Sequence, residues 1–257
     1  ANFTGELIRR RTSLKFEIDS DDVIMKYVSD HPSEHIREAS GIMLKPLRKV
    51  PTDTVQVMKN LFTDPVAARK IVDNIDKFQE KIWGVARIAR SSGIDANVYR
   101  HLPEDVIYKW WDYNNRELYI RQCNSVEFGA ERMKSIRPLV NDIVKKADEA
   151  LSTGRYAADL KFGHDYPLLS LASYLHLSGV GDVVSFDEIP TRWNDPMNIP
   201  LASNLQIIFY RSKKSQDILV KFVYNDEERT IAGLEPVSGV YYKWEDVKKF
   251  IDKRKTE

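Results

Sequence analysis

Two ionisable side chains stand next to each other at His164 and Asp165, directly after Gly163. An imidazole beside a carboxyl group can bind an anion with one group and deliver a proton with the other. Gly163 lets the backbone turn tightly, Asp165 can cap a helix, and Pro167 is tolerated in a first helical turn. A phosphate is the ligand that such a helix N-terminus favours. A capping aspartate beside a surface turn histidine is the competing interpretation of the same residues.

The elements on either side of this pair follow from periodicity. Residues 157–162 alternate apolar with polar side chains, which predicts a strand, and apolar residues recur at helical spacing from Leu168 to His176. The pair would then lie at the carboxyl end of a strand. Open α/β sheets bind their ligands at that edge.

The run Phe162-Gly163-His164-Asp165, between this strand and a helix that ends in Leu-x-Leu-x-Gly, resembles the second signature of the branched histidine phosphatases. This family of histidine acid phosphatases includes phytases and multiple inositol polyphosphate phosphatases. Residues 198–210 and 218–224 are similar to the closing hairpin of those enzymes. The resemblance implies an α/β fold, with part of a histidine-phosphatase-like sheet, flanking helices and an inserted α-helical cap. It also implies that His164 binds the transferring phosphoryl group and that Asp165 protonates the leaving-group oxygen.

The family's first signature, an Arg-His-Gly triplet with the nucleophilic histidine, is absent. The five histidines are His31, His35, His101, His164 and His176, and none is followed by glycine. We therefore assign no nucleophile in this chain. Because the family places that triplet at the amino end of the domain, we expect the chain to be the carboxyl-terminal portion of such a phosphatase. We expect it to be inactive without the missing N-terminal segment of the same protein.

For the intact protein the resemblance implies hydrolysis of phosphomonoesters through a phosphohistidine intermediate, with no metal and no cofactor. The substrate would be a phosphorylated small molecule, and inositol polyphosphates such as phytate are the family's example. The family also implies a periplasmic or secreted location. Two alternatives stay open: a non-catalytic phosphate-binding or interaction module, and a metal-dependent His-Asp phosphohydrolase.

Composition excludes several other classes. Lys plus Arg is 39 and Asp plus Glu is 38 in 257 residues, so we expect neither a nucleic-acid partner nor a membrane partner. No apolar run reaches the roughly 18 residues that a membrane-spanning helix needs. Cys123 is the single cysteine, which rules out an intrachain disulfide and any multi-cysteine metal site.

Patterning divides the chain into three parts. Residues 1–32 are the first part of an α/β domain, with a strand at Leu14–Ile18; residues 33–152 are a helical cap-like insertion; residues 153–257 complete the α/β domain. Within the insertion, helices are expected from Ser33, Asp53, Asp64, Pro103 and Ser125, the third of them running unbroken to Gly93. Trp83, Trp110 and Trp111 are interpreted as packing anchors. A hairpin of residues 205–210 and 218–224 and a closing helix at 242–250 are expected as scaffold.

Overall fold

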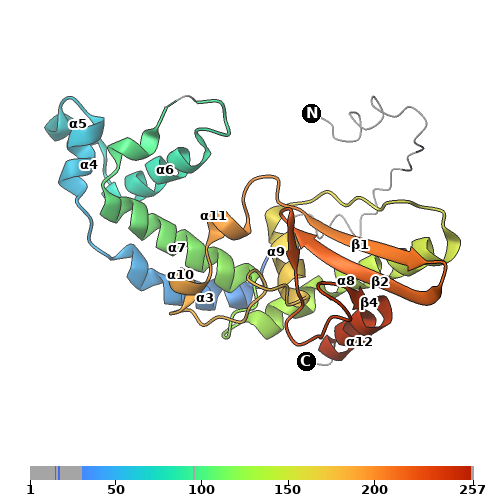
Figure 1. The fold of residues 1–257 in the computed structure, drawn as a ribbon. Coiled ribbons are helices and arrows are strands. Elements are labelled where there is room, and N and C mark those ends of the chain that lie inside the picture. Colours follow the sequence, from blue (N-terminus) through green and yellow to red (C-terminus); the bar gives the residue numbers. More distant parts are fainter. Residues whose placement is uncertain (1–14, 16, 18–30, 95, 256–257) are drawn as a thin grey trace.

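The computed structural model describes residues 15, 17, 31–94 and 96–255 (Figure 1). The strand predicted at Leu14–Ile18 therefore lies outside the described residues, except for Lys15 and Glu17. The described chain is a mixed α/β structure, as expected, with a helical block at one end and an antiparallel sheet at the other (Figure 1). Among these residues, none of the helices combines the length and the apolar character that crossing a membrane requires.

The helical block occupies residues 34–122. It consists of α3 (Glu34–Arg48), α4 (Thr54–Leu61), α5 (Pro65–Ile71), α6 (Ile75–Ile88), the 3-10 helix η2 (Val98–His101) and α7 (Glu104–Gln122). The next helix, α8 (Gly129–Thr153), packs with the sheet. The side chains of Ser33, Asp53 and Asp64 each accept a backbone N–H of the helix that follows. These caps confirm the predicted starts of α3, α4 and α5, because each satisfies a donor that the helix leaves unpaired.

The prediction of one unbroken helix from Asp64 to Gly93 is wrong. The chain leaves the helix at Val72, and Asn74 begins a new one, with its side chain accepting the Lys77 N–H at 2.9 Å. Asn74 has extended backbone angles, and its short amide side chain competes for the backbone donor in the way that caps do. The result is two helices, α5 and α6, that can take different directions.

The sheet is formed by β1 (Leu205–Ser212), β2 (Ser215–Tyr224), β3 (Glu227–Arg229) and β4 (Tyr242–Lys243), with β2 paired antiparallel to each of the other three. The predicted hairpin is confirmed, although its strands continue further than expected and only two residues, 213–214, join them. A second tight turn, Asn225 and Asp226, joins β2 to β3. Both residues have positive φ, at 49° and 64°, as a two-residue hairpin turn requires. The closing helix is α12 (Trp244–Arg254).

The strand predicted at residues 157–162 is also wrong. Residues 154–164 have no regular secondary structure and run past the sheet towards α9 (Asp165–Tyr174), as Figure 1 shows. Alternating residues become a strand only where a neighbouring strand supplies hydrogen bonds. Within the described residues the sheet contains no strand beside this segment.

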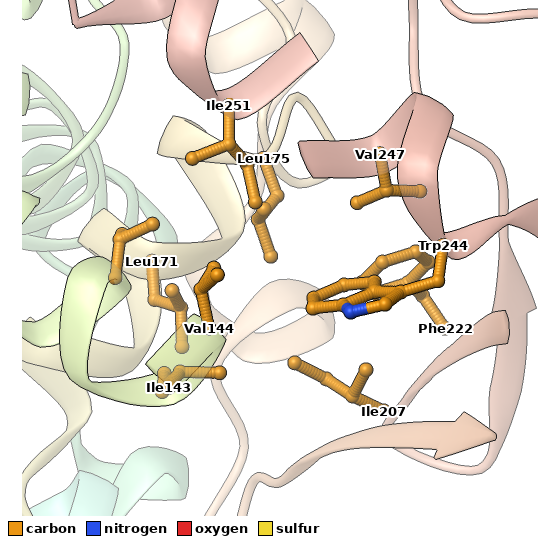
Figure 2. Close-up of a pocket in the computed structure, with 10 residues that line it drawn as sticks. Ile143, Val144, Leu171, Leu175, Ile207, Phe222, Trp244, Val247 and Ile251 are labelled. Atoms are coloured by element: carbon orange, nitrogen blue, oxygen red, sulfur yellow. The ribbon is translucent and has the colours of Figure 1, made fainter. Parts of the chain in front are cut away.

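Two apolar cores hold the structure together. The larger lies between α8, α9, the sheet and α12, where Leu171, Phe222 and Trp244 are among the side chains that line a small apolar pocket (Figure 2). The smaller lies inside the helical block and includes Trp83 and Trp110. Both tryptophans are buried, which confirms them as packing anchors, whereas Trp111 is only partly buried.

The remaining short helices, α10 (Ile189–Arg192) and α11 (Asp195–Asn198), follow α9 in the chain. Both helices contact α7, so this part of the chain returns to the helical block before it enters the sheet. Phe186, just ahead of them, packs against both cores.

Candidate functional site

His164 and Asp165 lie at the N-terminus of α9. His164 is the N-cap residue, with extended backbone angles, and its ring makes no capping bond within the described structure. Asp165 is the first helical residue, and its Oδ1 accepts the Tyr166 N–H at 3.0 Å. Both side chains are exposed. Asp165 thus accepts a backbone N–H of the first turn, as a capping residue would, although it is the first residue of the helix and not its N-cap. Its exposed carboxyl group remains accessible to a ligand.

The rest of α9 is anchored in the interior. Leu169, Leu171 and Ala172 are buried in the larger core. The Ser170 hydroxyl donates to the Gln122 carbonyl at 2.7 Å and accepts from Arg132 Nε at 2.9 Å. These bonds tie α9 to the end of α7 and to α8, so the exposed pair stands at the end of a fixed helix.

Tyr166 connects the pair to the helical block. Burial raises the pKa of its phenol; Asp165 and Glu117 raise it further, while Arg121 and Arg87 lower it. These four groups therefore lie within electrostatic range of the Tyr166 hydroxyl. Residues of α6 and α7 thus share one electrostatic environment with the first turn of α9.

Arg121 is held in place by two helices. It pairs with Glu117 one turn earlier in α7, and its Nε donates to Ser40 Oγ of α3 at 2.9 Å. The His31 ring packs edge-on against the Tyr166 ring at a centroid separation of 6.3 Å. A second imidazole is therefore close to the residue that follows Asp165.

Arg87 is oriented by a buried carboxylate. Asp195, at the start of α11, is 3% exposed and accepts from Arg87 Nη2, Trp111 Nε1 and Asn114 Nδ2 at 3.3, 3.1 and 3.2 Å. Burial raises the pKa of Asp195, and the arginine opposes that shift. The arrangement fixes the direction of the Arg87 guanidinium, which is 40% exposed.

The other histidines lie elsewhere. His35 bonds to Glu131 at 2.8 Å, His101 accepts from its neighbour Arg100, and His176 contacts Asn124 beyond the far end of α9. Among the described residues, no group of three or more His, Cys, Asp or Glu side chains is arranged to hold a metal ion.

Sequence reasoning found His164 and Asp165 because they are adjacent, but it missed the groups around them. Glu117 and Arg121 carry a local signal, the i,i+4 spacing of an ion pair on one helix face. That signal does not say what the pair faces. For Arg87 and His31 the sequence holds no signal, because the effect of Arg87 on Tyr166 and the ring contact of His31 with it join residues far apart in the chain.

No protein-family model matches the chain, and no curated protein sequence does. Similar folds are found in crystal structures of the multiple inositol polyphosphate phosphatase of Bifidobacterium longum. The complex with inositol hexasulfate has a TM-score of 0.60 at 18% identity, over 69% of this chain and 39% of that one. The apo form has a TM-score of 0.58 at 17% identity, over 68% of this chain and 39% of that one. The phosphate complex has a TM-score of 0.58 at 17% identity, over 69% of this chain and 40% of that one.

The chain thus spans only 39–40% of the length of the structures that it resembles. Identity of 17–18% establishes the likeness of fold and no more. This likeness of fold agrees with the resemblance of the motif at residues 162–165 and of the closing hairpin to the same enzymes. The fold of this chain therefore resembles part of the fold of the Bifidobacterium longum multiple inositol polyphosphate phosphatase.

Proposed function

We propose that this chain is part of a phosphomonoesterase of the histidine acid phosphatase type, whose substrate is a phosphorylated small molecule such as an inositol polyphosphate. The observation that carries the proposal is the exposed pair His164 and Asp165 on the first turn of α9, within a fold shared with inositol polyphosphate phosphatases. The family resemblance adds a periplasmic or secreted location to the proposal.

In this proposal His164 donates a hydrogen bond to the phosphoryl group, and the N–H groups at the start of α9 supply partial positive charge. Arg121 and Arg87 add to the positive potential around Tyr166. Asp165 is the general acid. In that role Asp165 gives its proton to the leaving oxygen as the bond to phosphorus breaks.

The nucleophile comes from outside this chain. None of the five histidines has the Arg-His-Gly context of the family's nucleophile. The intact protein would form a phosphohistidine without metal or cofactor, and this chain alone would not turn substrate over.

The proposal is tested on the intact protein with two substrates, phytate and an aryl phosphate with a good leaving group. Asp165→Asn should slow hydrolysis of phytate far more than that of the aryl phosphate, because only the poor leaving group needs a proton. His164→Ala should impair both substrates. Asp252→Asn, an exposed aspartate on α12, is the matched control and should leave both rates unchanged. Equal losses on the two substrates in Asp165→Asn would remove the acid role.

The absence of an Arg-His-Gly triplet from the sequence favours a second candidate, a non-catalytic phosphate-binding module. That function predicts phosphate binding that depends on His164, without phosphate release by the intact protein. The metal-dependent alternative predicts loss of activity with a chelator, whereas the phosphohistidine route predicts full activity.

A further inference from the structure

The two edges of the sheet differ in character. On one side of β2 lie β3 and β4, strands of three and two residues, and β3 consists of Glu227, Glu228 and Arg229. On the other side lies β1, which has eight residues and pairs with β2 alone within the described part of the chain. Proteins keep an open edge from pairing with a further strand by making it short and charged. The edge formed by β3 is of that kind, and the edge formed by β1 is not.

The features that protect an edge are found at only one end of β1. Residues 205–210 read Leu-Gln-Ile-Ile-Phe-Tyr, without a charge or a proline. Arg211, and the register shift between Arg211 and Ser212, come where the chain turns into β2. In every second residue of a strand with one neighbour, the backbone N–H and C=O point away from that neighbour. A long, uncharged edge with such groups is a surface on which a further strand pairs.

The apolar side chains of β1 are also less covered than those of β2. Ile207 and Phe209 are partly buried, whereas the residues opposite them in β2, Phe222 and Val220, are buried. All four side chains belong to the larger core or pack against it. A strand on the open edge of β1 would remove more of this apolar surface from water, which favours its addition.

Residues 157–162 pass the same helix as β1. The Lys161 ammonium donates to Asp142 Oδ2 of α8 at 2.6 Å. The next residue of α8, Ile143, lines the small apolar pocket together with Ile207 of β1 (Figure 2). The segment and β1 therefore lie at neighbouring residues of α8, yet in the described structure they do not pair with each other. Residues 157–162 alternate as a strand does and lack the neighbour that a strand needs.

We propose that a β-strand from the part of this protein outside residues 1–257 pairs with the open edge of β1 and has residues 157–162 as its neighbour on the other side. The inference rests on the proposed function, in which this chain belongs to a longer protein; the chain covers 39–40% of the similar phosphatase structures. The side of the added strand that faces α8 is apolar, because the larger core continues there.

The test is residue-resolved hydrogen–deuterium exchange of the intact protein, which needs no substitution. A strand with one neighbour protects every second amide, whereas a strand with two neighbours protects all of them. All amides of residues 206–210 should therefore exchange at least about a hundredfold more slowly than in an unstructured peptide, and amides of residues 158–162 should be protected too. Leu219 and Val220, which pair with both β1 and β4, are the internal control for a strand with two neighbours. Protection of only every second amide in β1 would overturn the proposal.

Two further measurements identify the partner strand. Protection of β1 that disappears on dilution would assign the pairing to a second copy of the protein and overturn the proposal. Phe16→Pro, in the strand predicted at Leu14–Ile18, should leave exchange in β1 unchanged, and a loss of protection would place the partner within this chain instead. Phosphate release separates this inference from the proposed function. Full protection of β1 without phosphate release would contradict the phosphatase function alone, and alternate protection in an active phosphatase would contradict the strand pairing alone.

Discussion

Asp195 and Arg87 meet at 3.3 Å although 108 residues separate them in the chain. The carboxylate is buried and the guanidinium is partly exposed, and Trp111 and Asn114 of α7 donate to the same carboxylate. The Asp195 N–H in turn donates to Asn115 Oδ1 at 2.8 Å. One residue of α11 therefore joins α6 and α7 to the chain that follows α9.

Replacing Asp195 by asparagine should lower the free energy of unfolding by about 1–3 kcal/mol, because an amide NH₂ would face donors where the carboxylate accepted three bonds. Urea denaturation measures the loss. The control is Asp187→Asn, an exposed aspartate close by in the chain, which should change stability by less than about 0.5 kcal/mol. Equal stabilities for the two variants would contradict a stabilising role of the cluster.

The stability that Asp195 contributes should depend on pH. Burial raises its pKa above the ordinary value of 3.8, so in the window just above that value the folded protein binds more protons than the unfolded chain. Stability therefore falls as pH rises through this window. The difference in urea midpoint between the parent and Asp195→Asn should be smaller at about pH 7 than at about pH 4. A difference that grows with pH would show that the folded-state pKa is lowered instead.

Two glycines should respond to alanine with opposite signs. A Cβ on Gly181 would lie 2.5 Å from the Ala172 carbonyl oxygen at the end of α9, so Gly181→Ala should destabilise the protein by about 1–3 kcal/mol. On Gly84, inside α6, a Cβ would meet no described atom within 4 Å, and alanine should stabilise the helix by about 0.5–1 kcal/mol. Thermal unfolding of both variants measures the two shifts, and a Gly181→Ala variant as stable as the parent would contradict the packing at Gly181.

The thiol of Cys123 should report on unfolding. It is fully buried, and burial raises its pKa to about 12. The reactive thiolate is therefore about a thousandfold rarer in the native state than in the unfolded chain at the same pH. At about pH 8, a disulfide reagent should leave the native protein unmodified and react with one thiol in urea. Rapid modification without urea would contradict the burial.

Local signals in the sequence predicted the helices well. Ser33, Asp53 and Asp64 cap helices as expected, because a cap is a contact between residues three apart. The break at Val72 was missed although Asn74 carried a capping signal, since no proline or glycine marks it. The strand at residues 157–162 was wrong for another reason. A strand depends on a neighbour that local alternation does not reveal.

The candidate site likewise has a part that local sequence signals predict and a part that depends on contacts between distant residues. His164 and Asp165 are neighbours in the sequence, and their position at a helix start follows from Gly163 and the apolar spacing behind them. The effect of Arg87 and Arg121 on the pKa of Tyr166 joins residues of α6, α7 and α9 that are far apart in the chain.

The hydrogen bonds of Asp195 also determine when the helical block can be completed during synthesis of the chain. Its partners on α6 and α7 are made 81 to 108 residues earlier, so they leave the ribosome long before the carboxylate that satisfies them. Until residue 195 emerges, the indole of Trp111 and the guanidinium of Arg87 must be solvated by water. The helical block is therefore synthesised early, but its hydrogen bonds to Asp195 can form only after α11 has been made. A nascent chain that ends before α11 lacks the carboxylate that connects α6 to α7.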